Sequence, residues 1–538
     1  MAYTVDRRAY AMDRSVGRVH ADIYTVELET GARKKVLERV EDGYLQASPG
    51  GRYLLYLRDD HYWVFDLTTG AHTNITKAVA SSFVDKQSDE TVKQKPGFGV
   101  AGWTTGDAAV WLYDRTDIWS IAPDGSRAQR LTDGVRDQVR HRYVRLDADV
   151  DVIDPAASAF VSLFGLWTKQ SGYARLQANG SSPVVERAMF EAKAINGLIK
   201  AKRSDVYAYV RQAFDDSPDL FVGDAGLAGA RQVSETNPFQ SRYAWGRTEL
   251  VEYKSDKGER LQGVLHYPAG FEAGRKYPMV VYMYERLSDG LHSYVSPSER
   301  APYNASVFTG RGYFFFQPDI VFRPREPGLS VVECVVPAVK QVIAGGQVDA
   351  ARVGVVGHSW GGFDASYLAT HTDVFAAAVA GAAITNLVSN YGNFHWSNGI
   401  AETDHIETGQ QRMEVPIYED LPAYIRNSAV FGVQNMKTPL LLSVGDGDGT
   451  VFWHQGLELY NIARRAGKNV VVVAYAGEDH GLRKKPNQVD YHHRIQQWFD
   501  HYLKGEPAAP WITDGVSVLD RERELKRPKP AATSPKTP

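Results

Sequence analysis

The pattern of apolar and polar residues changes near residue 245. Before that point, short segments alternate with a period of two, carry an aromatic residue and end in a turn that contains Gly. Segments of this kind are 22–31, 62–70, 117–125, 172–180 and 219–226. Alternation bounded by such turns predicts strands joined by tight connections. No long segment of helical period interrupts them, which indicates an all-β N-terminal domain.

The repeat distance of these units favours a β-propeller. The aromatic positions Tyr24, Trp63, Trp119, Tyr173 and Phe221 are separated by 39, 56, 54 and 48 residues. These intervals suit one four-stranded blade each, with loop insertions. We predict an N-terminal all-β propeller over residues 1–245 that is partial, with about 4–5 blades. A β-sandwich with similar hairpins is the alternative.

After residue 245, strand-like runs alternate with segments of helical period, which is typical of a parallel sheet covered by helices. The expected strands are 279–283, 313–317, 353–356, 440–444 and 470–474, and the expected helices are 335–344, 363–370, 454–466 and 489–503. We assign residues 246–508 to this second domain, with a mostly parallel sheet. Residues 509–538 are polar and rich in Pro and Lys, and we expect them to be disordered.

Composition excludes several classes of protein. The chain has 538 residues, 43% of them apolar, and a net charge of −3, so a large core is expected but no basic surface for nucleic acid. The single cysteine, Cys334, is expected to be a buried apolar residue. The longest apolar stretch, 375–384, is too short to span a membrane. The first twenty residues lack the apolar region of a secretory signal, which would leave the chain in the cytoplasm as it stands.

The sharpest local motif is Gly357-His358-Ser359-Trp360-Gly361, which follows a β-branched run and precedes a helical segment. This is the G-x-S-x-G pattern of a nucleophile elbow in its strand, turn and helix setting. Small residues at 357 and 361 let the strand and the helix approach closely, and the turn exposes the Ser359 hydroxyl. The N–H of Trp360 would then point at a carbonyl under attack.

A serine hydroxyl needs a base to act as a nucleophile, and the base needs an orienting acid. Two later strands end in suitable residues: 440–444 runs into a loop with Asp446 and Asp448, and 470–474 runs into the segment that contains His480. Because the order in this fold is serine, acid and histidine, His480 is the expected base. The pattern itself leaves the choice between Asp446 and Asp448 open.

From about residue 236 to 504 the chain resembles the catalytic domain of the prolyl oligopeptidase family of serine peptidases, which pairs a propeller with an α/β-hydrolase domain. The resemblance rests on Thr236-Asn-Pro-Phe239, on the first-strand pattern at 257–268 with Lys276-Tyr277-Pro278, on the doubled Gly361-Gly362, and on the acid and histidine segments. It implies Asp448, not Asp446, as the acid of a triad with Ser359 and His480.

The same resemblance implies an oxyanion donor and a pocket. In dipeptidyl-peptidase-like members a Tyr hydroxyl joins the backbone N–H that follows the nucleophile, which here gives Tyr284 and Trp360. Tyr282 is the neighbour to confuse with Tyr284, since strand alternation would point both to one face. The pocket candidates are Asn386, Tyr391 and Trp396, and Trp360 is a further one. No match to the paired glutamates of dipeptidyl members is found.

Two features depart from the family pattern. About seven blades are usual there, so the propeller is short, and we expect the chain to be a fragment or a truncated product of a larger peptidase, which would also allow a periplasmic or secreted location. In addition, Phe322-Arg-Pro-Arg-Glu-Pro-Gly328 replaces a Gly-rich stretch common in the family, which leaves the subfamily and the substrate preference open.

The sequence thus predicts a serine peptidase that acts on short peptides through an acyl-enzyme. An esterase or acyl hydrolase on the same fold is one alternative, since a fold does not fix a substrate. A propeller binding module with a silent hydrolase domain is the other. No HExxH motif or Cys/His spacing indicates a metal, and no cofactor is expected. The oligomeric state is left open.

Overall fold

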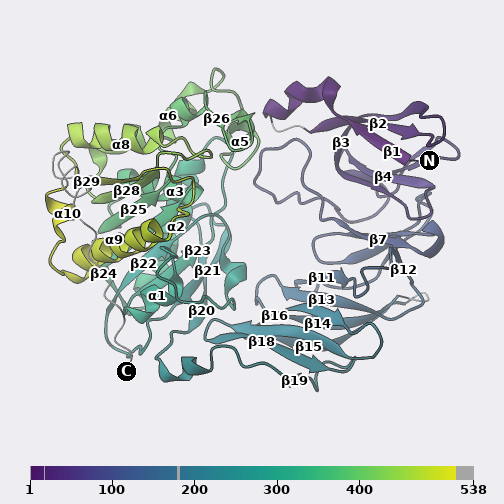
Figure 1. Cartoon of the computed structure of the whole chain (residues 1–538), viewed down its shortest axis with the longest axis horizontal. Coiled ribbons are helices and arrows are strands. Elements are labelled where there is room, and N and C mark those ends of the chain that lie inside the picture. Colours follow the sequence, from purple (N-terminus) through teal and green to yellow (C-terminus); the bar gives the residue numbers. More distant parts are fainter. Residues whose placement is uncertain (1, 17–18, 179–181, 516–538) are drawn as a thin grey trace.

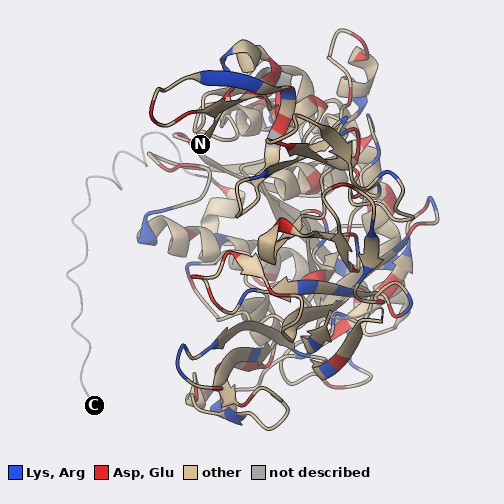
Figure 2. Ribbon diagram, turned by 90° about the vertical axis from the view of Figure 1, so that its right-hand side faces the viewer, with Lys and Arg blue, Asp and Glu red and all other residues tan. Residues whose placement is uncertain are grey.

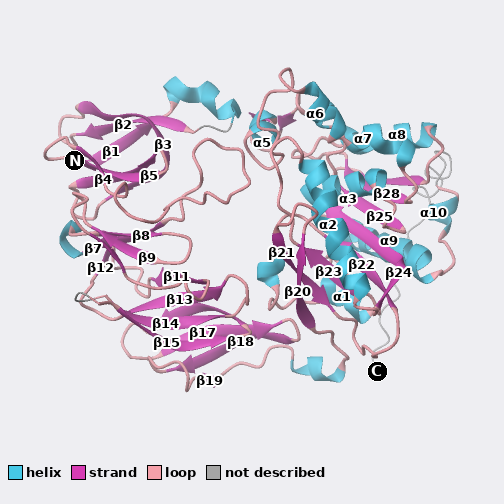
Figure 3. Cartoon of the chain, turned by 180° about the vertical axis from the view of Figure 1, so that it is seen from behind, coloured by secondary structure: helices cyan, strands magenta, loops and turns pink. Residues whose placement is uncertain are grey.

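The computed structural model describes residues 2–16, 19–178 and 182–515, and it places two structural halves side by side (Figure 1). The N-terminal half is built from strands and the C-terminal half from a large sheet with helices on it (Figure 3). Lys and Arg are interspersed with Asp and Glu along the ribbon seen from the side of the N-terminal half (Figure 2), as expected for a chain of nearly balanced charge.

Within the described residues the N-terminal strands form four mostly antiparallel sheets, arranged as an arc that faces the C-terminal half (Figure 1). The first sheet contains β1 (Ala2–Asp6), β2 (His20–Val26), β3 (Arg33–Ala47), β4 (Tyr53–Arg58), β5 (His61–Asp66) and β6 (His72–Asn74). The second contains β7 (Val100–Thr104), β8 (Val110–Tyr113), β9 (Ile118–Ile121), β10 (Ala128–Arg130) and the short parallel β12 (Val152–Ile153).

The third sheet contains β11 (Val139–Val144), β13 (Ala159–Gly165), β14 (Ser171–Gln177) and β15 (Val184–Glu191). The fourth contains β16 (Ala194–Lys200), β17 (Tyr207–Ala213), β18 (Asp216–Gly223) and β19 (Arg231–Gln232). Successive sheets pack face to face through apolar side chains: Trp111 and Val161, for example, belong to one core that joins the second sheet to the third. Each sheet therefore buries its faces against its neighbours, as propeller blades do.

The C-terminal half contains an eight-stranded sheet with the order β20-β21-β23-β22-β24-β25-β28-β29. Its strands are β20 (Thr248–Lys254), β21 (Arg260–His266), β22 (Tyr277–Tyr282), β23 (Phe314–Pro318), β24 (Val348–His358), β25 (Ala377–Gly381), β28 (Leu440–Gly445) and β29 (Val470–Tyr475). The first two strands pair antiparallel, and the six from β23 to β29 pair parallel. The last strand of the fourth N-terminal sheet ends at Gln232, and the first strand of the eight-stranded sheet begins at Thr248.

Helices cover both faces of this sheet, which is why its central strands are apolar on both sides. Along β28, Leu440 and Leu442 point into one core and Leu441 points into the other. Helices α2 (Pro327–Ala344), α3 (Trp360–His371) and α8 (His454–Arg465) pack in the first core. Helices α1 (Ala305–Gly310), α9 (Lys485–Lys504) and α10 (Pro510–Thr513) pack in the second.

Helix α2 has the length and apolar composition that would allow it to cross a membrane, and among the described helices it alone does. However, 61% of it is buried inside the fold, where Val331, Val335 and Val339 contact the sheet and helix α3. The composition of α2 is therefore that of a core helix.

The C-terminal end of the described chain differs from the expected tail. Residues 510–513 form α10, in which Ile512 is 7% exposed and Trp511 stacks near Trp498 of α9. The prediction of disorder from residue 509 is wrong for this segment, because two apolar side chains among the polar ones are enough to fix it against α9. The rest of the predicted tail, 516–538, lies outside the described residues.

Candidate active site

Ser359 lies at the turn between β24 and α3, in a backbone conformation with φ 59° and ψ −120° that non-glycine residues rarely adopt. The Ser359 N–H donates to the Gly381 carbonyl over 2.9 Å, and its own carbonyl accepts from the Phe363 N–H. The side chain therefore projects from the sheet while the backbone is held from both sides. A hydrogen-bonded strained turn is what the sequence motif predicts.

The glycines around Ser359 are required by close backbone contacts. A Cβ on Gly357 would lie 1.9 Å from the Gly361 carbonyl oxygen, and one on Gly361 would lie 2.3 Å from the Met283 carbonyl oxygen. A Cβ on Gly362 would lie 2.5 Å from the Gly381 carbonyl oxygen. A side chain at Gly357 would push α3 away from β24, and a side chain at Gly361 or Gly362 would push α3 away from Met283 or from β25.

His480 and Asp448 reach Ser359 from the loops that follow β29 and β28. His480 Nε2 lies 2.9 Å from Ser359 Oγ, and His480 Nδ1 lies 2.9 Å from Asp448 Oδ2. The other Asp448 oxygen accepts from the backbone N–H groups of Thr450 and Val451. The Asp448 side chain is 1% exposed. Three donors, His480 Nδ1 and the N–H groups of Thr450 and Val451, therefore orient a buried carboxylate.

Asp446, the other acid of this loop, points elsewhere. Its Oδ1 accepts from the Gly477 N–H over 2.5 Å and ties the β28 loop to the β29 loop. The Gly447 N–H donates to the Glu478 carbonyl, and the Glu478 side chain accepts from the N–H groups of Arg483 and Lys484. These contacts fix the two loops together, and the structure thereby places Asp448, not Asp446, beside His480.

His358, next to Ser359 in sequence, also lies beside His480, with ring centroids 4.9 Å apart. Burial, and then the neighbouring His480 imidazole, lower the pKa of His358 to about 4. Its Nδ1 lies 3.5 Å from the Tyr303 hydroxyl. His358 is therefore a neutral packing residue at ordinary pH and does not compete with His480 as a base.

Tyr284 lies next to the elbow: its ring is 3.5 Å from where a Cβ on Gly361 would be. Its hydroxyl accepts a hydrogen bond from Gln410 Nε2 over 3.1 Å. Strand β22 ends at Tyr282, so the alternation does not continue to Tyr284. Tyr282 packs in the core that contains α9, whereas Tyr284 packs in the core that contains α3. The expectation that both rings share one face is wrong for this reason.

The pocket candidates have different environments. Asn386 caps the short helix α4 (Leu387–Asn390) by accepting from Val388 N–H, and it donates to Glu458 of α8. The Tyr391 hydroxyl donates to Glu407, and its ring packs on Tyr424. Both side chains are therefore engaged in contacts between elements of the fold.

Of Trp360 and Trp396, only Trp396 exposes its ring to solvent. Trp360 is fully buried, and its ring stacks on Phe363 with ring centroids 4.2 Å apart. Its side chain therefore belongs to the core, and the expectation that it lines a pocket is wrong. Its N–H, in the first turn of α3, has no carbonyl one turn earlier to bind. Trp396 is 66% exposed, in the hairpin of β26 (Phe394–His395) and β27 (Ile400–Ala401). That hairpin is tied to the acid loop by the Ser397 N–H, which donates to the Gly449 carbonyl over 2.8 Å.

Sequence reasoning missed a buried charged network beside Tyr284. The Arg412 guanidinium, 2% exposed, binds both oxygens of Glu285 over 3.0 and 3.2 Å. It also binds Asp89 of the N-terminal half over 2.9 Å, and Asp89 accepts from the Phe322 N–H. Gln410 donates to both Glu285 and the Tyr284 hydroxyl. A chain of polar contacts thus runs from the loop 82–97 of the N-terminal half to Tyr284.

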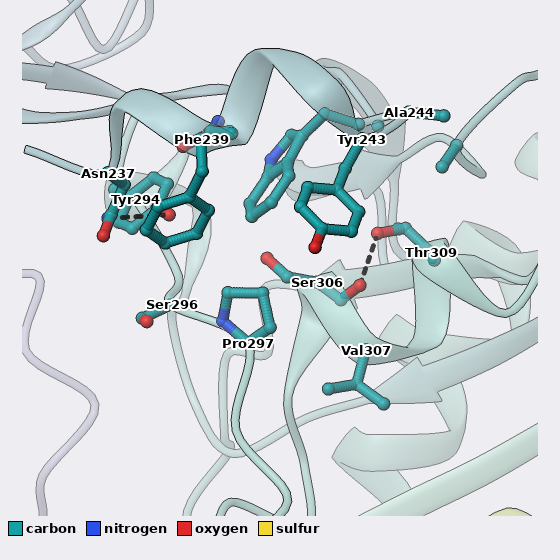
Figure 4. A pocket seen from close by; sticks show the side chains of 15 residues that line it. Asn237, Phe239, Tyr243, Ala244, Tyr294, Ser296, Pro297, Ser306, Val307 and Thr309 are labelled. Carbon is teal, nitrogen blue, oxygen red and sulfur yellow. Dashed lines mark hydrogen bonds between the residues drawn. The ribbon is translucent and has the colours of Figure 1, made fainter. Parts of the chain in front are cut away.

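A separate cavity of about 630 Å³ lies between the 3₁₀ helix Pro238–Arg242 and helix α1 (Figure 4). Phe239, Tyr243, Tyr294 and Pro297 face one another across it. None of the residues that line it belongs to the group around Ser359. This cavity therefore adds nothing to the site of Ser359.

We expect Asp89→Ala to lower the free energy of unfolding by about 1–3 kcal/mol, because it removes one of two anionic partners of a buried guanidinium. Urea denaturation followed by tryptophan fluorescence measures this change. Glu90→Ala, at the exposed neighbouring position, is the matched control and should change stability by less than about 0.5 kcal/mol. Equal unfolding midpoints for the two variants would show that the bridge to Arg412 contributes nothing.

Comparison with known proteins agrees with this architecture. Residues 325–506 match the sequence model of the prolyl oligopeptidase family. Dipeptidyl-peptidase 5 of Porphyromonas gingivalis is 25% identical over 329 residues, which are 56% of this chain and 45% of that protein. The acylamino-acid-releasing enzyme of Mus musculus is 28% identical over 192 residues, 35% of this chain and 26% of that enzyme. The chain thus spans less than half the length of these curated relatives.

Solved structures share the fold across both halves. A puromycin-hydrolyzing peptidase of Mycobacterium tuberculosis superposes with a TM-score of 0.63 at 17% identity, over 91% of this chain and 75% of that one. The acylaminoacyl peptidase of Pyrococcus horikoshii gives a TM-score of 0.53 at 15% identity, over 91% and 92%. An N-terminal propeller with a C-terminal hydrolase domain is the architecture of these peptidases, and residues 325–506 of this chain are similar to the prolyl oligopeptidase family.

Proposed function

We propose that this chain is a serine peptidase that hydrolyses short peptides through an acyl-enzyme formed on Ser359. The observation that carries the proposal is the pair of 2.9 Å contacts that link Ser359 Oγ to His480 and His480 to Asp448. A serine, an imidazole and a buried carboxylate in this order form the arrangement that activates a hydroxyl for acyl transfer. The match to the prolyl oligopeptidase family supports peptide bonds as the substrate class.

In the first half of the reaction, His480 Nε2 takes the proton of Ser359 Oγ as the oxygen bonds to the substrate carbonyl carbon. Asp448 holds the Nδ1–H of His480 and stabilises the imidazolium that forms. The imidazolium then gives its proton to the leaving amine as the carbon–nitrogen bond breaks, and an ester on Ser359 remains. In the second half, water loses a proton to His480 and attacks the ester, and the proton returns to Ser359 Oγ.

The oxyanion of each tetrahedral intermediate would be bound by the Trp360 N–H and the Tyr284 hydroxyl. The first belongs to the residue after the nucleophile, at the start of α3, where no carbonyl of the helix accepts it. The second belongs to a ring that contacts the elbow. Gln410 donates to the oxygen of Tyr284, which leaves the proton of that hydroxyl available to a substrate.

The N-terminal half would restrict the substrate to short peptides. We propose that its four described sheets are blades of a β-propeller. The loop 82–97 of that half reaches the region of Tyr284, where Asp89 binds Arg412 and Thr91 donates to the Glu407 carbonyl. Both a folded protein and a short peptide would have to pass between the two halves to reach Ser359, and the smaller size of the peptide would favour its entry.

Ser359→Ala tests the whole proposal. The native chain should react with a fluorophosphonate probe and cleave peptides in a mixed library, and the variant should do neither, with a loss in kcat/KM of at least about 1,000-fold. Mass spectrometry of the labelled protein and of the library measures both. Labelling with turnover of esters alone would favour an esterase, and absence of labelling in the native chain would favour a silent hydrolase domain.

Asp448→Asn should lower kcat by about 1,000- to 10,000-fold, because the amide would favour the wrong tautomer of His480. Asp446→Asn is the matched control in the same loop: its side chain accepts from Gly477 N–H and does not contact His480, so we expect less than a tenfold loss. Steady-state kinetics on one peptide measure both variants. Equal losses would contradict the assignment of Asp448.

Tyr284→Phe should lower kcat by about 100- to 1,000-fold with little change in KM, because the hydroxyl would contact the substrate oxygen only as it becomes charged. Tyr282→Phe is the control, since Tyr282 packs in the other core beside Phe315. The same kinetic assay separates them. A Tyr284→Phe enzyme with native kcat would remove Tyr284 from the mechanism.

A further inference from the structure

A second group of functional side chains lies close to the acid loop, on the hairpin that carries Trp396. The strands β26 and β27 pair antiparallel, with His395 opposite Ile400. Helix α5 (Thr403–Glu407) follows directly, with Glu402 at its N-cap position. The hairpin and the helix start bring the side chains of His395, Glu402 and His405 together.

The distances within this group suit a metal ion. One nitrogen or oxygen of each residue lies within 4.8 Å of those of the other two. His395 Nδ1 is 3.4 Å from Glu402 Oε1. In a tetrahedral site with bonds of about 2.0–2.2 Å, neighbouring ligand atoms are about 3.3–3.6 Å apart. His395 Nδ1 and Glu402 Oε1 are therefore already spaced like two ligands of one ion. A movement of the His405 side chain would bring its ring nitrogen to the same spacing.

The polar atoms of this group lack partners that would explain their burial. Glu402 is 4% exposed, and within the described part of the chain neither its Oε1 nor His395 Nδ1 has a hydrogen-bond partner. Burial of an unpaired carboxylate is costly. A cation between these side chains would satisfy both atoms and offset the buried charge.

We infer that His395, Glu402 and His405 bind a transition-metal ion of the zinc class, with water completing the coordination. Two imidazoles and one carboxylate suit zinc, nickel, copper or iron, whereas magnesium and calcium prefer oxygen ligands alone. Three protein ligands leave one tetrahedral position open. His395 and His405 are partly exposed, so that position can be reached from solvent. This inference does not depend on the proposed peptidase activity.

The bound ion would hold the hairpin beside the acid loop. His395 and Glu402 flank the turn whose Ser397 N–H donates to the Gly449 carbonyl, one residue beyond Asp448. The exposed ring of Trp396 is part of the same turn. An ion that links the hairpin to α5 would therefore fix the position of Trp396 relative to Asp448, and the ion itself would take no part in the chemistry at Ser359.

The test is metal binding to the metal-free chain, with any affinity tag removed. Co²⁺ is followed by its visible absorption and Zn²⁺ by calorimetry. We expect one ion per chain, an absorption spectrum of four-coordinate Co²⁺, and a loss in affinity of at least about 100-fold in the double variant His395→Ala/His405→Ala. Glu402→Gln keeps the size of the side chain and should weaken binding by at least about tenfold. His493→Ala, an exposed histidine of α9, should bind like the native chain.

His480 lies beside the Asp448 carboxylate and could also take up the added ion, so His480→Ala is titrated in parallel. Retained binding in His480→Ala together with loss in Glu402→Gln supports the inference. Binding that disappears in His480→Ala, that survives in Glu402→Gln with native affinity, or that is absent from the native chain at millimolar metal overturns it. If the double variant does not fold, as judged by circular dichroism, the conservative Glu402→Gln variant decides the result.

Discussion

The close approach of strand β24 and helix α3 at Ser359 is the constraint on which the rest of the site depends. The backbones of Gly357 and Gly361 are so close that no side chain would fit between them. The same holds for Gly362 and Gly381 of β25. This packing forces Ser359 to a positive φ and lifts its hydroxyl out of the sheet. The strain is held because the strand lies in the middle of the sheet, with neighbours on both sides.

The parallel sheet then determines which residues can reach Ser359. The strands β24, β28 and β29 lie close together in the sheet, and the loops after their carboxyl ends open at the same edge. Ser359, Asp448 and His480 come from these three loops. The contacts between the loops, from Asp446 to Gly477 and from Gly447 to Glu478, set the distance between acid and histidine. Convergence of the three side chains is therefore a consequence of topology, and the contacts between the loops fix their final positions.

Much of this could be predicted from the sequence, because local signals encode it. Each strand and helix expected in the C-terminal half is present, with ends that differ by up to eight residues, the largest difference being at the start of α2, and the elbow motif marks Ser359. Contacts between distant segments could not be predicted. Asp89 and Arg412 are 323 residues apart, and no period or motif joins them. The different directions of Tyr282 and Tyr284 depend on the residue at which β22 ends. The Asn386 side chain caps α4 and binds Glu458, and only the packed structure reveals this second contact.

Local backbone contacts and contacts between distant segments hold different parts of the site. The residues around Ser359 are fixed by close backbone contacts at Gly357, Gly361 and Gly362. Tyr284 and Trp396, in contrast, are held by side chains and loops from other segments: the Asp89, Arg412 and Glu285 network on one side and the hairpin on the other. Through Asp89, the N-terminal half therefore contacts the network that holds Tyr284, the oxyanion donor proposed above, whereas Ser359 is held by contacts within the C-terminal half.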